Sequence, residues 1–571
     1  MAQFANAKPA GLFTRWPALF LCAATAAVVF SYSVLTADPF GLPKFVYGGV
    51  LAALAFAAAA YGAATGSRPF AVCGPDGAVA AMLAAVALSA FFSVDPPLSW
   101  LGHYEFYAYG FAACVVYALL YASAAQLRSP RERRWVTRTL ALAGAAAGVV
   151  AGLQAVGVEP FPGVPTAAAF GGRAISVFGN PVYAGAVFAL LLPISLYEAQ
   201  NSNRARPLFL LALVAVIAGA ALTKSRGAWG AAAAGTAFYL WASGFLEARG
   251  LTRRRAAAVL AVAVLLLCVA GALVISGKRD SDRGRVALWR SCPQIWASRP
   301  IVGVGPAAFG NEFRRVRSLE FIRTLGSGAS QANAHNDFLE VLCTTGLVGG
   351  IAYLWLLIAC WNCLRSALDG PERRAEAASI ESEKRPVRRG VSAAVVGALL
   401  LAAGALFSAV ALRWSKADRA ALRARVYQNV RQTQWAFDHY RAAISANPFE
   451  TEYRMKYLRF LFDRVGKETD AGRKREWSTE AVSVARASVR LRPAHVDSHQ
   501  MLGLALMKMG DLGDAGLYPQ AAEALDDALE RAPRFPMLLK MRGAAAEKIG
   551  DGPTADAMRR RLAEIGQGPP S

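Results

Sequence analysis

The sequence predicts an all-α protein in which a polytopic membrane helix bundle of about 11 spans is followed by a soluble α-helical repeat domain. Three observations predict this class: an apolar composition, long uninterrupted apolar blocks, and a change to polar composition after Leu412. Of the 571 residues, 55% are hydrophobic, and the mean hydropathy is +0.32. Soluble proteins of this length are less apolar and arrange their apolar residues in short periodic patterns. The composition therefore excludes a purely cytosolic enzyme.

Eleven segments are long and apolar enough to cross a bilayer core, which takes roughly 20 helical residues. They lie at 17–36, 45–65, 75–92, 104–123, 135–156, 178–197, 207–223, 227–245, 256–277, 337–364 and 391–412. The first is followed at once by a second apolar segment and shows no clear small-x-small cleavage site, so we expect a span and not a cleaved signal peptide. The predicted transmembrane domain covers 1–412.

The distribution of Lys and Arg predicts the orientation. These residues concentrate at 126–134, 246–255 and 365–390, all on the side that holds the N-terminus. The four short loops on the other side contain few of them, namely Lys44, Arg173, Lys224 and Arg226. By the positive-inside rule, the N-terminus is expected in the cytoplasm and the C-terminal tail on the outer side, which in a Gram-negative cell is the periplasm. The same rule accounts for the net charge of +23, so no nucleic-acid partner is expected.

One predicted outer segment departs from this rule. The large periplasmic loop at 278–336 contains ten Lys or Arg against four Asp or Glu. A miscounted span upstream would explain the charge. The alternative is that these arginines face an anionic ligand on the outer side, and we favour it because the other loops support the orientation.

The tail after the last span has a repeated pattern. Amphipathic helices end in AISANP, SVRLRP and ALERAP, at Pro448, Pro493 and Pro533. Residues 420–565 thus resemble tetratricopeptide repeats with insertions, whose usual period is 34 residues, and 566–571 form a short end. Such repeats stack into a concave surface that binds a protein partner. An unrelated helical bundle is the alternative.

The candidate chemical groups lie on the predicted outer side. His335 is the one histidine in the large outer loop, and Arg173, Arg226, Arg285 and Arg290 lie next to predicted spans. Guanidinium groups match phosphate oxygens in bidentate geometry, so a membrane-embedded diphosphate is a fitting partner. Alternatively, each arginine reaches lipid headgroups or a nearby carboxylate, and His335 caps or packs the next helix. No zinc motif and no nucleotide-binding loop is present, so neither a metal nor a cofactor is expected.

Several motifs together resemble the O-antigen ligase and O-antigen polymerase superfamily. AHNDFLEVLCTTGLVGG at 334–350 resembles its signature. Four further segments match in order: SVDPPLSWLG at 93–102, GGRAISVFGNPVYAGAVFALLLP at 171–193, TKSRGAWGA at 223–231 and GRVALWRSCPQIWASRPIVGVGPAAF at 284–309. The resemblance implies a metal-independent membrane glycosyltransferase without a nucleotide-binding domain. The implied donor is a glycan on undecaprenyl diphosphate, and the implied acceptor is lipid A core, a polysaccharide or a protein hydroxyl.

The resemblance also implies site residues. The family pattern falls on His335, Arg173, Arg226 and Arg285, with Asn336 and Asn180 in support. Two positions depart from it. Family chains often have Glu nine residues after the histidine, where this chain has Thr344, and Glu340 is the candidate to compensate. The family's Asn-Pro-Asn reads Asn-Pro-Val at 180–182, and a single predicted span follows the signature segment.

The expected mechanism is inverting glycan transfer. His335 takes the proton of an acceptor hydroxyl, as suits an imidazole whose pKa is about 6.5, and the arginines stabilise the leaving diphosphate. An O-antigen or exopolysaccharide polymerase and a protein O-oligosaccharyltransferase are alternatives of the same class. A lipid-linked glycan transporter is a further alternative, and a membrane scaffold that acts through its repeat tail is another.

Overall fold

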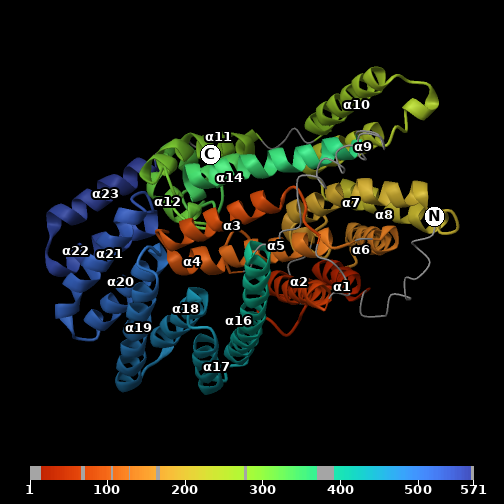
Figure 1. Cartoon of the computed structure of the whole chain (residues 1–571). Coiled ribbons are helices and arrows are strands. Elements are labelled where there is room, and N and C mark those ends of the chain that lie inside the picture. The colour runs from red at the N-terminus through yellow and green to blue at the C-terminus, as the bar shows by residue number, and fades with distance from the viewer. Residues whose placement is uncertain are drawn as a thin grey trace. The chain divides into compact units, whose positions relative to one another are not determined.

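The computed structural model describes residues 15–65, 71–104, 107–127, 129–161, 167–274, 279–368 and 391–566. Throughout these ranges the regular structure is helical, with no strand (Figure 1). The all-α prediction is therefore confirmed. The chain divides into two compact units, each assembled from stretches far apart in sequence. Unit 1 takes in Met1–Gly74, Val115–Gly277 and Cys360–Ser415, and unit 2 takes in Pro75–Cys114, Lys278–Ala359 and Lys416–Ser571.

Unit 1 is a bundle of apolar helices. Its helices are α1 (Trp16–Phe30), α2 (Gly41–Ala64), most of α5 (Phe111–Ala125), α6 (Pro130–Ala155), α7 (Pro181–Asn201), α8 (Arg206–Leu222), α9 (Arg226–Ala242) and α10 (Arg253–Val274). α6 packs on α1, α7 and α8, and α9 packs on α7 and α10. A Cβ at Gly148 would lie 2.2 Å from the carbonyl oxygen of Ala215, so a glycine permits the close approach of α6 and α8. Small residues at helix crossings are typical of membrane bundles.

Several of the described helices have the length and polarity of membrane spans. Each of the eleven predicted apolar segments overlaps a helix. Five helical stretches are long and apolar enough to cross a bilayer: Gly41–Ala64, Pro130–Ala155, Pro181–Asn201, Asp337–Ser366 and Ala398–Asn429. Trp16–Phe30, Asp76–Phe91, Phe111–Ala125 and Arg206–Leu222 are shorter apolar helices. The polytopic membrane bundle is thus confirmed, while the number of spans and their orientation stay predictions; most of the basic loop at 365–390 lies outside the described residues.

Unit 2 contains the segment predicted as a large periplasmic loop. Much of it is helical, in α11 (Arg279–Ser298), α12 (Phe309–Val316) and α13 (Leu319–Leu325). Apolar side chains of these helices form a buried cluster that includes Ile295, Phe313 and Phe321. α3 (Asp76–Phe91), α4 (Pro96–Leu101) and the first part of α14 (Asp337–Leu368) belong to the same unit.

The glycine-rich run GVGPAAFG docks on a break in α14. The break lies at Gly346, which has φ 63° and ψ −160°. The N–H groups of Val304 and Gly305 donate to the carbonyls of Cys343 and Thr344 at 3.0 and 2.9 Å. Beyond the break, the N–H of Leu347 donates to Pro300 O at 2.9 Å. The run therefore supplies the hydrogen-bond partners that the interrupted helix lacks, as buried backbone groups require.

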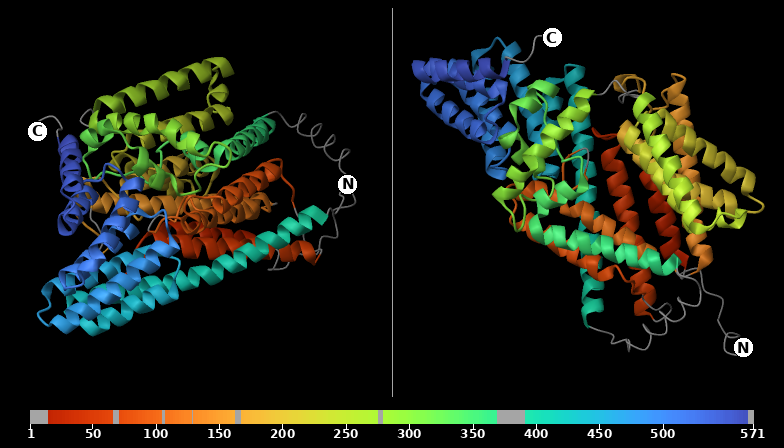
Figure 2. Two further views of the ribbon diagram at one scale, coloured as in Figure 1. Left: turned by 90° about the vertical axis from the view of Figure 1, so that its left-hand side faces the viewer. Right: turned by 90° about the horizontal axis from the view of Figure 1, so that it is seen from above.

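The predicted boundary at 412–420 falls inside one helix. α16 (Val391–Asn429) runs as a single long helix through it (Figure 2). The sequence offers no break, since it has neither Gly nor Pro between Gly404 and Pro448.

The tail is a succession of helices, each of which packs on the next. They are α17 (Thr433–Ala446), α18 (Thr451–Lys467), α19 (Ala471–Leu491), α20 (Val496–Asp511), α21 (Tyr518–Arg531), α22 (Pro536–Ile549) and α23 (Gly552–Gly566). The three repeated endings share one backbone geometry at their cap residues: Asn447 (φ −134°, ψ 84°), Arg492 (φ −135°, ψ 81°) and Ala532 (φ −143°, ψ 67°). The repeated sequence pattern thus marks a repeated turn, and the tetratricopeptide assignment itself stays a prediction. Residues 567–571 lie outside the described residues.

Candidate functional site

The backbone just before His335 is held from two sides. The N–H of Ala334 donates to Oε2 of Glu340 at 2.7 Å. The carbonyl of Ala334 accepts from the indole N–H of Trp289, on α11, at 2.9 Å. Ala334 is fully buried. Both backbone polar groups of Ala334 are therefore fixed, and the position of the following histidine is fixed with them.

His335 has a strained backbone and an accessible ring. Its φ is +51°, in the left-handed region that non-glycine residues rarely adopt. The N–H of His335 donates to Oδ1 of Asn333 at 3.1 Å, which supports this conformation. The ring atom Nε2 lies 2.9 Å from Oε1 of Gln331, and the residue is exposed. Strained residues of this kind cluster at functional sites because the surrounding structure must hold them.

Arg285 lies close enough to His335 to influence its charge. Partial burial of the ring lowers the pKa of His335, and the positive charge of Arg285 lowers it further. Arg285 is exposed and, among the described residues, takes part in no hydrogen bond or ion pair. It precedes Trp289 by one turn of α11, so the two side chains share a helix face. The structure thus brings together a neutral imidazole and an available guanidinium.

Asn336 and Glu340 support the histidine from α14. Oδ1 of Asn336 accepts from the N–H of Leu339 at 3.2 Å, which caps the helix. Glu340 is buried and binds Ala334 as described. At the position where a family glutamate was expected, the hydroxyl of Thr344 donates to the carbonyl of Glu340 at 2.6 Å. Glu340 therefore reaches the histidine segment, and Thr344 satisfies a helix carbonyl.

Several arginines of the basic 278–336 segment have partners within the protein. Arg290 forms a two-pronged ion pair with Glu320 at 2.9 and 3.1 Å. Arg314 pairs with Asp497 of the tail at 3.0 Å, and the buried Arg317 donates to the carbonyls of Ser327, Ala329 and Arg534. Burial lowers the pKa of Arg317 to about 10. The positive charge that the sequence presents at this segment is thus partly neutralised internally.

The remaining predicted residues lie together in unit 1. Nε of Arg173 donates to the carbonyl of Thr223 at 3.0 Å, and burial lowers the pKa of Arg173. Thr223 lies three residues before Arg226, the first residue of α9. Asn180 caps α7 through a hydrogen bond from the N–H of Val182 at 2.8 Å. The start of α7 meets the same turn, since a Cβ at Gly185 would lie 3.1 Å from the hydroxyl oxygen of Thr223.

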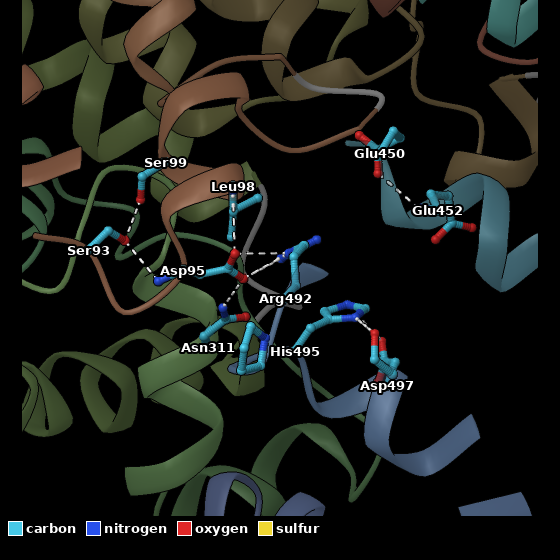
Figure 3. A network of polar contacts seen from close by, with 12 residues as sticks. Ser93, Asp95, Leu98, Ser99, Asn311, Glu450, Glu452, Arg492, His495 and Asp497 are labelled. Atoms are coloured by element: carbon cyan, nitrogen blue, oxygen red, sulfur yellow. Dashed lines mark hydrogen bonds and ion pairs between the residues drawn. The ribbon is translucent and has the colours of Figure 1, made fainter. Parts of the chain in front are cut away.

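Two features were not predicted from the sequence. One is the set of residues that position the histidine, and the other is a buried ion pair. Trp289, Gln331 and Asn333 contact the histidine segment, yet only the Arg-x-x-x-Trp spacing drew attention to the first of them. Asp95, in SVDPPLSWLG, pairs with Arg492 of the tail through contacts of 2.6–3.0 Å (Figure 3). No local signal links two residues so far apart in sequence.

The charges around Asp95 keep it ionised. Its side chain is fully buried and that of Arg492 is 9% exposed. Burial alone would raise the pKa of Asp95, but the Arg492 guanidinium, His495 and the hydrogen bond from Asn311 together outweigh burial, so the pKa lies below its ordinary value. Asn311 of α12 donates to the same carboxylate at 2.9 Å.

Among the described residues, no group of three or more His, Cys, Asp or Glu is arranged to hold a metal ion.

Comparison with protein families gives a match over part of the chain. Residues 210–354 match the family model described as O-antigen ligase. The matched range contains Arg226, Arg285, Trp289, His335 and Glu340. No curated protein and no solved structure matches the chain.

Proposed function

We propose that this membrane protein transfers a glycan from undecaprenyl diphosphate to an acceptor hydroxyl. The proposal starts from the match of residues 210–354 to the O-antigen ligase family model. The match supports O-antigen ligase-like or polymerase-type activity in general. The observation that carries the proposal further is the proximity of an exposed, rigidly held His335 to Arg285, which has no hydrogen-bond or ion-pair partner among the described residues. The reaction would take place on the periplasmic side of a bacterial inner membrane.

His335 is proposed as the general base. With Oε1 of Gln331 as acceptor, Nε2 of the ring bears the proton and Nδ1 presents its lone pair. The lowered pKa keeps the ring neutral at physiological pH, which is the form that accepts a proton. The deprotonated hydroxyl attacks the anomeric carbon, the bond to the diphosphate oxygen breaks, and the configuration inverts.

Arg285 is proposed to stabilise the leaving diphosphate. An unpartnered guanidinium can form two parallel hydrogen bonds with phosphate oxygens. Donors that meet developing negative charge contribute about 100- to 1000-fold in rate elsewhere. Arg173 and Arg226 stay predicted diphosphate ligands. Arg290 also stays one, but a diphosphate would have to compete with Glu320 for its guanidinium.

The experiment is reconstitution of the full chain in vesicles with a lipid-linked glycan and candidate acceptors. A single addition to lipid A core identifies a ligase, a ladder on the carrier lipid a polymerase, and a glycosylated polypeptide a protein transferase. Movement of intact lipid-linked glycan across the bilayer without transfer would identify a transporter. His335→Ala and Arg285→Ala should each remove most transfer while the protein still inserts, and full activity in both variants would refute the proposed site.

A further inference from the structure

A polar cavity lies within unit 2, apart from the histidine segment. Its volume is about 300 Å³. Its walls come from the segment after α4, from α12 and from two turns of the tail, with Tyr104, Asn311, Phe449, Glu450 and Arg492 among the lining residues. Sites for small molecules occupy roughly 300–1,000 Å³, so the cavity has room for a small ligand.

Hydrogen bonds and an ion pair hold the residues that line this cavity. Arg492 and Asn311 line the cavity. The buried carboxylate of Asp95 binds both of them and holds them in place (Figure 3). Tyr104 donates its hydroxyl to Asp418 of α16 at 2.5 Å, and Nζ of Lys456 lies 4.2 Å from the centroid of its ring. Glu450 caps α18, since its Oε1 accepts from the N–H of Glu452 at 2.9 Å. Three separate parts of the sequence thus cooperate to shape one cavity.

Two of the charged groups retain unused hydrogen-bonding capacity. Arg492 binds Asp95 through Nε and Nη2, which leaves Nη1 without a partner among the described residues. Glu450 uses Oε1 to cap α18, which leaves Oε2 without a hydrogen-bond partner among the described residues. Burial raises the pKa of Glu450. A donor and an acceptor therefore remain available to a ligand in this cavity.

The charge pattern favours a neutral, hydroxyl-rich ligand. An anion would meet Glu450 and Glu452, and a cation would meet Arg314 and Arg492, all of which line the cavity. A hydroxyl group can both donate and accept, so it suits a mixed lining of this kind. Phe449 is 59% exposed and offers an apolar ring surface beside these polar groups. A sugar ring combines hydroxyl edges with an apolar C–H face.

We propose that this cavity is a carbohydrate-binding subsite, formed by the tail together with the segment after α4 and α12, which holds one or two neutral sugar rings. The choice of a glycan as occupant rests on the proposed function. The cavity itself contains none of the residues assigned to chemistry, so the subsite would select and retain a glycan and take no part in the reaction.

The test is saturation-transfer NMR on the full chain in lipid nanodiscs. The neutral probes are chitobiose, cellobiose and lactose, and the charged comparators are digalacturonate and a lysine tripeptide. At least one neutral disaccharide should bind, and Glu450→Gln and Phe449→Ala should each weaken its binding at least tenfold. Gln can still cap α18 through its amide oxygen, so Glu450→Gln tests the lost carboxylate and not a lost fold.

Two controls separate this proposal from the proposed function. Glu523→Gln, at an exposed site on α21, should bind the sugar as the wild type does. His335→Ala should also bind it normally while glycan transfer is lost. Sugar binding without any transfer would refute the transferase and keep the subsite. The subsite is refuted if no neutral disaccharide binds, if both cavity variants bind normally, or if only a charged comparator binds.

Discussion

The indole N–H of Trp289 donates to the carbonyl of Ala334 at 2.9 Å, which ties α11 to the residue before His335. Trp289→Phe keeps an aromatic ring and removes the donor. A hydrogen bond of this kind contributes about 0.5–1.5 kcal/mol, and small displacements of a catalytic group cost rate. We expect kcat for glycan transfer to fall about 3- to 10-fold with little change in KM, measured on vesicles containing lipid-linked glycan.

Trp296→Phe is the matched control. Trp296 lies on the same helix, and its buried indole nitrogen has no hydrogen-bond partner among the described residues. Its replacement removes no such bond, so transfer should stay at the wild-type rate. Equal losses in the two variants would show that Trp289 serves packing alone.

The charge of Arg285 should set the acid limit of activity. The guanidinium lowers the pKa of His335, and only the neutral ring accepts a proton, so the rate falls as the pH drops through that pKa. Arg285→Gln removes the positive charge and therefore raises the pKa of His335. The acid limb of the kcat/KM profile should move to higher pH, in addition to the loss of rate.

Arg290→Gln tests whether any charge on α11 has this effect. Arg290 is paired with Glu320, and both side chains are more than half exposed, so solvent screens them. Its removal should leave the acid limb where it is in the wild type. An unchanged limb in Arg285→Gln would mean that His335 does not titrate in the transfer step.

The sequence predicted the elements well because apolar blocks are local signals. Each of the eleven predicted segments became a helix, and the Pro448, Pro493 and Pro533 endings became one repeated turn. Arg285 lies close enough to His335 to lower its pKa, while the predicted site as a whole stays a prediction. These features depend on composition and on short spacings, which a single sequence displays directly.

The charge balance of the 278–336 segment could not be predicted in the same way. Its excess of arginine indicated an anionic ligand, but Arg314 and Arg317 find partners in the tail, at Asp497 and at the carbonyl of Arg534. Arg492 likewise finds Asp95, which lies 397 positions away in sequence. Such pairs depend on tertiary packing, which leaves no periodic trace in the chain.

The Asp95–Arg492 pair should contribute strongly to stability. Removing one partner of a buried ion pair costs about 3–5 kcal/mol, because the other charge stays buried without compensation. We expect Asp95→Asn and Arg492→Gln each to lower the thermal midpoint clearly, and the double variant to lose less than the sum. The exposed pair serves as control: Arg290→Ala should cost only about 0–1 kcal/mol.

The pH dependence of this stability follows from the lowered pKa of Asp95. The pair contributes fully above the ordinary carboxyl pKa of 3.8 and loses its contribution as the pH falls through the folded-state pKa. The Asp95→Asn variant lacks this contribution to the free energy of unfolding at every pH. The stability difference between wild type and variant should therefore be largest near neutral pH and shrink in acid, as followed by tryptophan fluorescence.

Gly346 should tolerate no side chain at the break of α14. Its φ of 63° with ψ of −160° lies in a region that is essentially restricted to glycine. A Cβ there would lie 2.3 Å from the carbonyl oxygen of Ile301, two residues before the run that docks on the break. Gly346→Ala should displace this run, lower the thermal midpoint and reduce transfer, because the same helix begins two residues after His335. Gly350→Ala, four residues on, meets no atom closer than 3.7 Å and should leave both measurements unchanged. Wild-type stability in Gly346→Ala would show that the break relaxes without cost and that the docked run does not position α14.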